Sequence, residues 1–166
     1  TSYRAYDQPT TDWPVTIAHP GGAYTDIVRD PYGKPTAITR RNSTGAISLT
    51  RSYTYNANQE LCRQVEPETG ATLMGYDGAG NLAWTAAGLA AGTACNAGGT
   101  IPTILARKVV RGYDARNRLK TLSFADSDGN QVWTYAPDGL PTNIVTTVLS
   151  DGRLVTNQYS YNRRRL

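Results

Sequence analysis

The sequence predicts an all-β fold, an array of consecutive antiparallel β-hairpins. Three features predict it: a short repeat centred on tyrosine, side chains that alternate between apolar and polar, and turn-forming residues at fixed places in the repeat. The repeat is clearest at residues 55–61, 76–82 and 113–119, which read YNANQEL, YDGAGNL and YDARNRL. A fixed internal repeat indicates a modular array in which each unit buries its apolar side against its neighbours.

The repeat keeps its register along most of the chain. Weaker copies lie at residues 29–35 and 135–141, and a sixth copy begins at Tyr161. The position after the tyrosine falls at residues 30, 56, 77, 114, 136 and 162, so the steps are 26, 21, 37, 22 and 26 residues. A basic unit of about 21–22 residues, with insertions, fits these steps. The residues expected to define the repeat are Tyr55, Asn56, Leu61, Tyr76, Asp77, Gly80, Leu82, Tyr113, Asp114, Leu119, Tyr135 and Gly139.

Each unit has room for two strands of about six to eight residues and two turns. Residues 47–55 place Ile47, Leu49 and Arg51 on one face and Ser or Thr on the other. This period of two is that of a strand rather than a helix. Residues 131–135 and 155–161 repeat the design. Gly or Pro interrupts nearly every stretch that could have formed a helix, so we expect no convincing helix.

The turn residues of the repeat have a conformational role. An Asp or Asn side chain accepts a hydrogen bond from the backbone two residues on, which begins a turn. A Gly or Asn about three positions later tolerates the positive φ that a bulged hairpin loop needs. A second set of turns at residues 68–70, 127–130 and 150–152 would close each unit. The residues expected at or beside the positive-φ position are Asn58, Gly80, Asn117 and Gly139.

Composition narrows the class of protein. We divide the chain into a weakly patterned N-terminal strand and loop region, residues 1–23, and the hairpin array, residues 24–166, and we expect a fragment of a longer chain. The 11 tyrosines are expected to supply part of the buried apolar area of a core. A tyrosine ring can be buried while its hydroxyl stays hydrogen-bonded. The net charge is +4, but the arginines are dispersed, which disfavours a nucleic-acid partner. The sequence has no apolar run of about 18 residues, so we expect no membrane span.

Two cysteines remain to be placed. Cys62 follows a turn, and Cys95 lies in the small-residue insertion that accounts for the step of 37 residues. A disulfide between them would anchor the insertion, with a stabilisation of about 3–4 kcal/mol from chain entropy. Two buried thiols, or a reactive thiol, are the alternatives. A disulfide would imply an oxidising compartment.

The sequence contains no clear catalytic or metal-binding constellation. His19 precedes Pro-Gly-Gly and is expected to be a loop residue, with a Cys-His dyad to Cys62 or Cys95 as the alternative. The segment 126–130 resembles the start of a calcium loop, but Pro137 stands where the closing Glu belongs. We therefore predict no metal, no cofactor and no enzyme.

The Tyr-Asp pattern, recurring about every 21 residues, resembles the YD repeat of Rhs proteins. Residues 76–82 and 113–119 match that motif well, residues 55–61, 135–141 and 161–166 match it partly, and the resemblance covers residues 24–166. Similar proteins are large secreted or surface proteins, among them bacterial Rhs toxins, insecticidal toxin-complex subunits and teneurins. The resemblance implies a curved or spiralling sheet that forms a hollow shell.

In the toxins that this chain resembles, the shell encloses a C-terminal cytotoxic domain, so the repeats are a container rather than a catalyst. Those toxins also carry an aspartyl autoprotease near an Asp-Pro-x-Gly-Leu motif. Residues 136–140 read APDGL. Ala136 stands where that motif has Asp before Pro, and another repeat follows, so we do not expect the protease activity here.

The function that the resemblance implies is a non-catalytic segment of a β-shell that encapsulates or displays a toxin or effector domain. Its partner would be the remainder of its own polypeptide. One alternative is an extracellular module that binds carbohydrate or a cell surface, with Trp13, Trp84 and Trp133 stacking on sugar rings. Another is self-assembly into filaments through unpaired strand edges. Each of these predicts a secreted or cell-surface protein.

Overall fold

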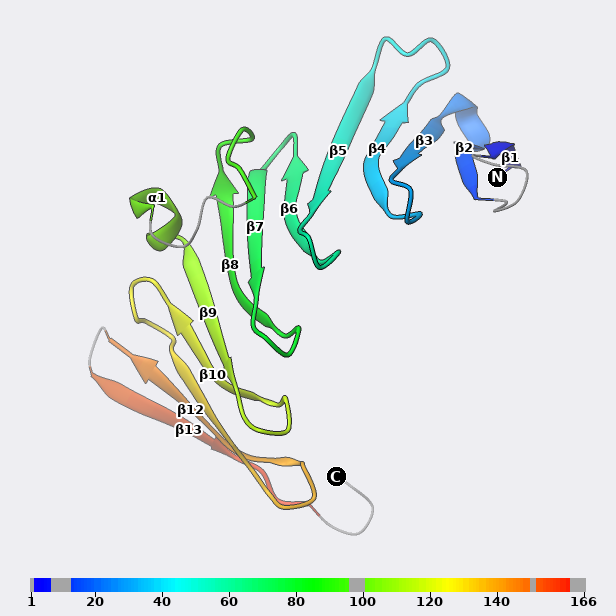
Figure 1. Ribbon diagram of the computed structural model, residues 1–166. Helices are drawn as coiled ribbons and strands as arrows, with labels where there is room; N and C mark the ends of the chain where they lie inside the picture. Colours follow the sequence, from blue (N-terminus) through cyan, green and yellow to red (C-terminus); the bar gives the residue numbers. More distant parts are fainter. Residues whose placement is uncertain (1, 7–12, 96–100, 150–151, 162–166) are drawn as a thin grey trace. The chain divides into compact units, whose positions relative to one another are not determined.

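The computed structural model describes residues 2–6, 13–95, 101–149 and 152–161, with side chains from residue 13 onward. Nearly all of the described chain is strand, turn or short connection (Figure 1). The strands are β1 (Ser2–Tyr6), β2 (Pro14–Ala18), β3 (Tyr24–Arg29), β4 (Pro35–Arg41), β5 (Ser48–Tyr55), β6 (Leu61–Glu66), β7 (Gly70–Tyr76), β8 (Leu82–Leu89), β9 (Lys108–Tyr113), β10 (Leu119–Phe124), β11 (Gln131–Tyr135), β12 (Pro141–Val148) and β13 (Arg153–Gln158).

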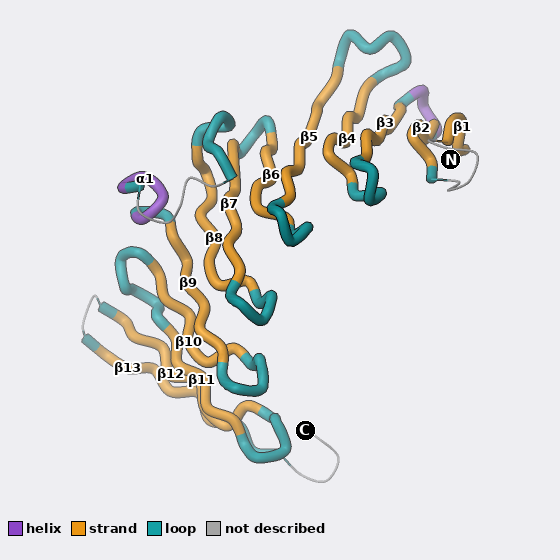
Figure 2. Tube along the Cα trace, in the orientation of Figure 1, coloured by secondary structure: helices purple, strands orange, loops and turns teal. Residues whose placement is uncertain are grey.

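The strands lie in the sheet in the order in which they occur in the chain, from β1 to β13. Neighbouring strands pair in antiparallel fashion, as between β3 and β4 and between β11 and β12. Strands and connecting turns alternate along the trace in Figure 2. The predicted fold, an array of consecutive antiparallel β-hairpins, is therefore confirmed.

The chain divides into two compact units. The first comprises Thr1–Leu73 and Gly88–Asn96, and the second comprises Met74–Ala87 and Ala97–Leu166. In the first unit, Asp26 of β3 lies opposite Thr39 of β4, and Thr39 lies opposite Thr50 of β5. In the second, Leu122 lies opposite Gln131, and Gln131 lies opposite Thr146. Strands β1 and β2 lie within residues 1–23, the region predicted to be only weakly patterned.

The prediction that the chain has no helix is wrong at two short segments. A 3-10 turn, η1, spans Pro20–Gly22, and a one-turn helix, α1, spans Pro102–Leu105 in the connection between β8 and β9. Each begins at a proline, whose fixed φ suits the first helical position. Ile104 of α1 is fully buried. Four residues are too few to show a helical period, so the sequence pattern gives no sign of α1.

Few side chains of this sheet are fully buried, because most strand residues are half-exposed. In β5 the predicted alternation holds at the start, where Ser48 and Thr50 are exposed and Leu49 and Arg51 are half-buried. Ile47, predicted on the apolar face, precedes the strand and is 73% exposed. The last predicted strand also shifts, since β13 ends at Gln158 rather than at Tyr161. The buried apolar residues are Ala18, Cys62, Ala71, Leu73, Ala86, Leu89 and Ile104.

Gly70, at the start of β7, provides a test of the packing. Its φ is +80°, and a Cβ added there would lie 2.4 Å from the carbonyl oxygen of Leu89. We expect Gly70→Ala to lower the free energy of unfolding by about 1–3 kcal/mol, through strain and displaced backbone. Gly78→Ala is the matched control, because nothing lies within 4 Å of a Cβ at Gly78. Equal effects of the two variants in urea unfolding would contradict this packing.

Candidate functional site: the repeated turn

One turn of five residues recurs in the structure, each time directly after an odd-numbered strand. In each copy the first residue donates its N–H to the carbonyl of the fifth, and the fourth donates its N–H to the carbonyl of the first. These N···O distances all lie between 2.9 and 3.0 Å. We call this the repeated turn. Its copies are residues 30–34, 56–60, 77–81, 114–118 and 136–140.

The fourth residue of the repeated turn always has a positive φ. It is glycine in three copies, with φ between 82° and 93°. In the other two it is Gln59, with φ 63°, and Asn117, with φ 57°. The prediction is confirmed for Gly80, Asn117 and Gly139, whereas in the second copy the left-handed residue is Gln59 and Asn58 lies beside it. A left-handed conformation costs a residue with a Cβ roughly 1–2 kcal/mol, so the contacts of the turn must hold Gln59 in place.

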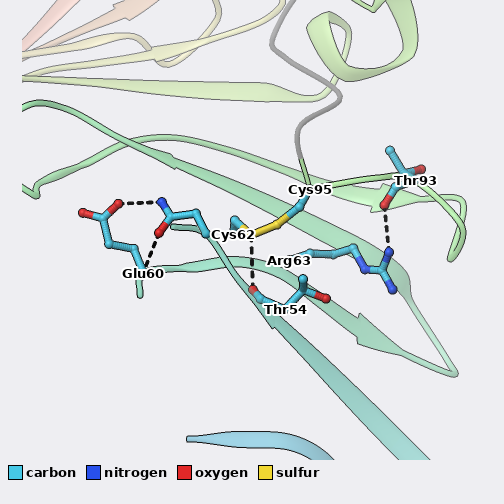
Figure 3. Close-up of a disulfide and its surroundings, with 7 residues drawn as sticks. Thr54, Glu60, Cys62, Arg63, Thr93 and Cys95 are labelled. Carbon is cyan, nitrogen blue, oxygen red and sulfur yellow. Dashed lines mark hydrogen bonds between the residues drawn. A yellow bond between two sulfur atoms is a disulfide. The ribbon is translucent and has the colours of Figure 1, made fainter. Parts of the chain in front are cut away.

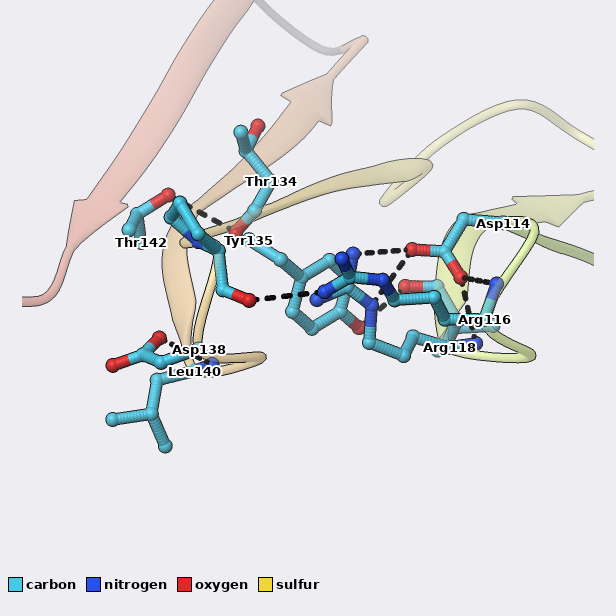
Figure 4. A network of polar contacts seen from close by, with 10 residues as sticks. Asp114, Arg116, Arg118, Thr134, Tyr135, Asp138, Leu140 and Thr142 are labelled. Carbon is cyan, nitrogen blue, oxygen red and sulfur yellow. Dashed lines mark hydrogen bonds and ion pairs between the residues drawn. The ribbon is translucent and has the colours of Figure 1, made fainter.

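The Asp or Asn at the first position organises the turn from within. Oδ1 of Asp114 accepts hydrogen bonds from the backbone N–H groups of Arg116, at 2.8 Å, and Arg118, at 3.0 Å (Figure 4). Asp77 and Asp30 accept the same two bonds, from the third and fifth residues of their turns. Asn56 accepts the bond from the fifth residue. The sequence predicted these residues as turn-formers, and their contacts match that role.

The side chain of the fifth residue often completes this arrangement. In the fourth copy, Nε of Arg118 donates to Oδ2 of Asp114 at 2.7 Å, and the guanidinium forms an ion pair with the same carboxylate. These bonds, together with those from the backbone, lower the pKa of Asp114 from 3.8 to about 2. Hydrogen bonds from Asn81 likewise lower the pKa of Asp77. Both aspartates are thus carboxylates with their acceptors occupied, which does not suit a general acid.

In three copies, the tyrosine directly before the repeated turn links one hairpin to the hairpin before it. The hydroxyl of Tyr55, the last residue of β5, donates to the carbonyl of Pro35, the first residue of β4, at 3.0 Å. Tyr113 at the end of β9 donates in the same way to Leu82 at the start of β8, at 3.0 Å. Tyr135 repeats the bond. We call this bond the tyrosine latch: Tyr55 to Pro35, Tyr113 to Leu82, and Tyr135 to Leu119.

A cation often covers the ring of the latch tyrosine. The Nζ of Lys34 lies 5.1 Å from the ring centre of Tyr55, and the guanidinium of Arg118 lies 4.3 Å from that of Tyr135. Both cations are the fifth residue of the preceding repeated turn. Burial raises the pKa of Tyr55 and Tyr135, so both phenols stay protonated and able to donate at neutral pH.

At residue 29 the cation and the aromatic ring of this contact exchange places: the arginine stands in the tyrosine position, and the ring belongs to the residue before the neighbouring strand. Arg29 ends β3 in the tyrosine position, and its Nη1 donates to the carbonyl of Pro14, the first residue of β2, at 3.3 Å. Trp13, directly before Pro14, receives the Arg29 guanidinium 5.8 Å from its ring centre. Here the cation is on the latch residue and the aromatic ring precedes the strand. The degenerate copy in the sequence therefore keeps the physical contact.

Neighbouring turns also contact one another directly. Asn81, the fifth residue of its turn, donates to Oδ1 of Asn117, the fourth residue of the next, at 3.0 Å. In the same way Lys34, the fifth residue of its turn, donates to the carbonyl of Gln59, the fourth residue of the next turn. In Figure 4 the Arg116 side chain extends toward the following turn, where its Nη1 donates to the carbonyl of Pro137 at 2.9 Å. Within each unit, the repeated turns thus form a row of contacts at one end of the strands.

The predicted disulfide between Cys62 and Cys95 is present (Figure 3). It joins β6 to the small-residue insertion between β8 and β9, across 33 residues of sequence. Nη1 of Arg63 adds a second link by donating to the carbonyl of Thr93 at 3.2 Å. Because both cysteines are in the bridge, the alternatives of free thiols and of a Cys-His dyad are excluded while it is oxidised. His19 lies beside the hydroxyl of Thr25, with its Nε2 2.9 Å away.

The three tryptophans predicted to stack on sugars have contacts with the protein itself. A Cβ added at Gly33 would meet the Trp13 ring at 1.9 Å, and one at Gly75 would meet the Trp84 ring at 2.0 Å, so each ring covers a glycine. The Nζ of Lys108 lies 4.8 Å from the ring centre of Trp84. Trp133 is half-buried. The sugar-stacking role of these residues stays a prediction.

Comparison with known proteins identifies the fold. No protein-family model matches the sequence, and no curated protein matches it. Solved structures do match: a crystal structure of TcdB2-TccC3-Cdc42 has a TM-score of 0.70, with 13% sequence identity over 95% of this chain and 8% of that chain. The chain has an Rhs-type fold. A crystal structure of TcdB2-TccC3 gives a TM-score of 0.67, 16% identity and coverage of 91% of this chain and 8% of that chain.

The Photorhabdus luminescens Tc holotoxin pore gives a TM-score of 0.67 and 14% identity, over 91% of this chain and 7% of that chain. The Rhs-type array described here therefore spans less than a tenth of the chains that it matches. At this level of identity the similarity establishes the fold. The predicted resemblance to Rhs proteins is confirmed in that sense.

Removal of one latch hydroxyl tests its contribution to the Rhs-type array. We expect Tyr135→Phe to lower the free energy of unfolding by about 0.5–1.5 kcal/mol, because it takes away the donor to the Leu119 carbonyl and keeps the ring. Tyr159→Phe is the control, since Tyr159 is 42% exposed and does not directly precede a repeated turn. Urea unfolding of both variants measures the difference, and an equal loss in the two would contradict the latch.

The lowered pKa of Asp114 predicts a dependence of stability on pH. A carboxylate whose pKa is lower in the folded chain stabilises the fold above its unfolded pKa, and this stabilisation is lost as the pH falls through the folded value. For Asp114 the window runs from about pH 4 to about pH 2. We expect the melting temperature to fall across this window, and to fall less in Asp114→Asn, which keeps the turn acceptor and removes the charge. The same pH profile in both proteins would contradict this assignment.

Loss of the disulfide should destabilise the first unit. A bridge across 33 residues contributes about 3–4 kcal/mol in the chain-entropy account. We therefore expect the variant Cys62→Ala/Cys95→Ala to unfold at a lower denaturant concentration than the oxidised protein. Dithiothreitol should lower the midpoint of the natural sequence and leave that of the variant unchanged. Insensitivity of the natural sequence to complete reduction would refute this role.

Proposed function

We propose that this chain is a non-catalytic structural segment of a larger Rhs-type protein, part of a β-shell that encapsulates or displays a toxin or effector domain. The observation that carries the proposal is the row of contacts between successive hairpins. Each latch and each repeated turn bonds to the neighbouring hairpin rather than to a space that a substrate could enter. Such an array extends by adding units, as the wall of a container requires.

The chemistry of the polar residues supports a role without catalysis. Asp77 and Asp114 have their oxygens occupied by the turns that they form. The two cysteines are bonded to each other. Within the described ranges no three His, Cys, Asp or Glu side chains are grouped to hold a metal ion. These two aspartates and two cysteines thus serve the architecture.

The partial exposure of most strand residues favours a role as a wall over a role in the core of a compact domain. Most strand residues of the described chain are neither buried nor fully exposed. A sheet that separates two compartments needs two such faces, whereas a sheet in a compact domain buries one of them. The similarity in fold to toxin-complex structures agrees with this interpretation.

We also propose a secreted or cell-surface location. The disulfide supports it, because such bridges persist in oxidising compartments. None of the helices in the described part of the chain is long and apolar enough to cross a membrane.

Electron cryo-microscopy of the complete polypeptide that carries this chain tests the proposal. We expect the repeats to form a closed wall around separate internal density. An open or solid arrangement, with no enclosed or attached domain, would overturn it.

Self-association is a second candidate, favoured by one observation. All six residues of β13 are exposed, and Leu154 is 65% exposed. An exposed strand edge can pair with another chain. Light scattering across a range of concentrations tests this candidate, and a monomer at every concentration would eliminate it.

A further inference from the structure

The first unit contains a hollow far from the repeated turns. It has a volume of about 430 Å³ and is lined by η1, the end of β4 and the start of β5. Pockets for small ligands range over about 300–1,000 Å³. No repeated turn or latch contributes to its lining, so the proposed wall function leaves this hollow unexplained. The residues that matter most to its chemistry are Gly21, Gly22, Arg40, Arg41, Ile47 and Leu49.

The two arginines of the hollow differ in their surroundings. Arg41 forms an ion pair with Asp26, and its guanidinium lies 4.7 Å from the ring centre of Tyr24. Arg40 is exposed and lies opposite Thr25 on one side and Leu49 on the other. No carboxylate of the described chain forms an ion pair with Arg40. Its guanidinium is therefore available to an anionic group, and it presents a planar fork suited to a carboxylate.

The other wall of the hollow is apolar. Ile47 is 73% exposed although the turn that carries it is fixed by hydrogen bonds. Its carbonyl accepts from the N–H of Asn42 at 3.0 Å, and its N–H donates to Oδ1 of Asn42 at 3.3 Å. Leu49 is half-buried two residues further on. An ordered turn that holds a branched aliphatic side chain in solvent next to a free guanidinium offers both apolar and ionic contact.

The glycines of η1 leave the third side open. Gly21 and Gly22 have φ values of +80° and +77°, and no atom lies within 4 Å of a Cβ built at either residue. A ligand backbone can approach this turn without meeting a side chain.

From this juxtaposition we propose that the hollow binds a short peptide segment in which a carboxylate lies next to branched aliphatic side chains. The carboxylate pairs with Arg40, and an aliphatic side chain packs on Ile47 and Leu49. Inorganic phosphate satisfies only the first of these contacts, because it has no apolar part. The inference does not depend on the proposed wall function, since it rests on the described residues of the first unit alone.

The probe is acetyl-Leu-Leu with a free C-terminal carboxylate, titrated by isothermal calorimetry. We expect saturable binding with a dissociation constant on the order of 0.1 mM, as for other ligands of this size. Arg40→Gln should weaken binding about tenfold, because it removes a charge-assisted bond. The same loss is expected when acetyl-Leu-Leu-amide replaces the acid, and Ile47→Ser should also weaken binding.

Arg107→Gln is the matched control, since Arg107 is exposed and belongs to the second unit. It should bind the probe as the natural sequence does. Circular dichroism establishes that each variant is folded before it is compared. Absence of binding to the natural sequence at millimolar probe would overturn the proposal. Equal binding of acid and amide, or of inorganic phosphate and peptide, would overturn it as well.

Discussion

At four places in the described chain, a side chain at the end of one strand is bonded to the first carbonyl of the strand before it and links two neighbouring hairpins. A two-stranded hairpin is marginally stable alone, and the described sheet buries few side chains completely. The ladder of backbone hydrogen bonds sets the register of neighbouring strands. The latch adds a side-chain bond at one end of that ladder, because it joins the residue before one turn to the residue after the previous one.

This constraint explains the composition of the repeat. A tyrosine is needed because its ring fills space above the sheet and its hydroxyl reaches a backbone acceptor. The Asp or Asn beside it is needed because the turn must satisfy backbone donors close to the latch. Arg29 meets the first demand with a guanidinium and takes its aromatic partner from Trp13. The repeated feature is thus an aromatic ring and a cation in contact at the end of a strand. Two different pairs supply it, Arg118 with Tyr135 and Trp13 with Arg29.

The sequence predicted the parts of this architecture that depend on local pattern. The hairpins, the turn residues Gly80, Asn117 and Gly139 and the Cys62–Cys95 bridge are confirmed, because alternation, turn chemistry and insertion length are readable along the chain. Residues 150, 151 and 162–166, which belong to a predicted turn and to the sixth copy of the repeat, lie outside the described residues. The helix α1 was missed since one turn has no period. The exchange of roles between Arg29 and Trp13 was also missed, because residue 29 and residue 13 become neighbours only through pairing of β2 with β3. The hollow beside Arg40 depends on the same kind of non-local contact.

A double-mutant cycle on Trp13 and Arg29 tests the latch most directly. The variant Trp13→Arg/Arg29→Tyr converts this pair into the arrangement that Arg118 and Tyr135 adopt. We predict that each single substitution lowers the free energy of unfolding, and that the double variant recovers most of the loss, with a coupling of about 0.5–1 kcal/mol. Strictly additive losses in urea unfolding would contradict it, because they would show that the two positions do not act as a pair.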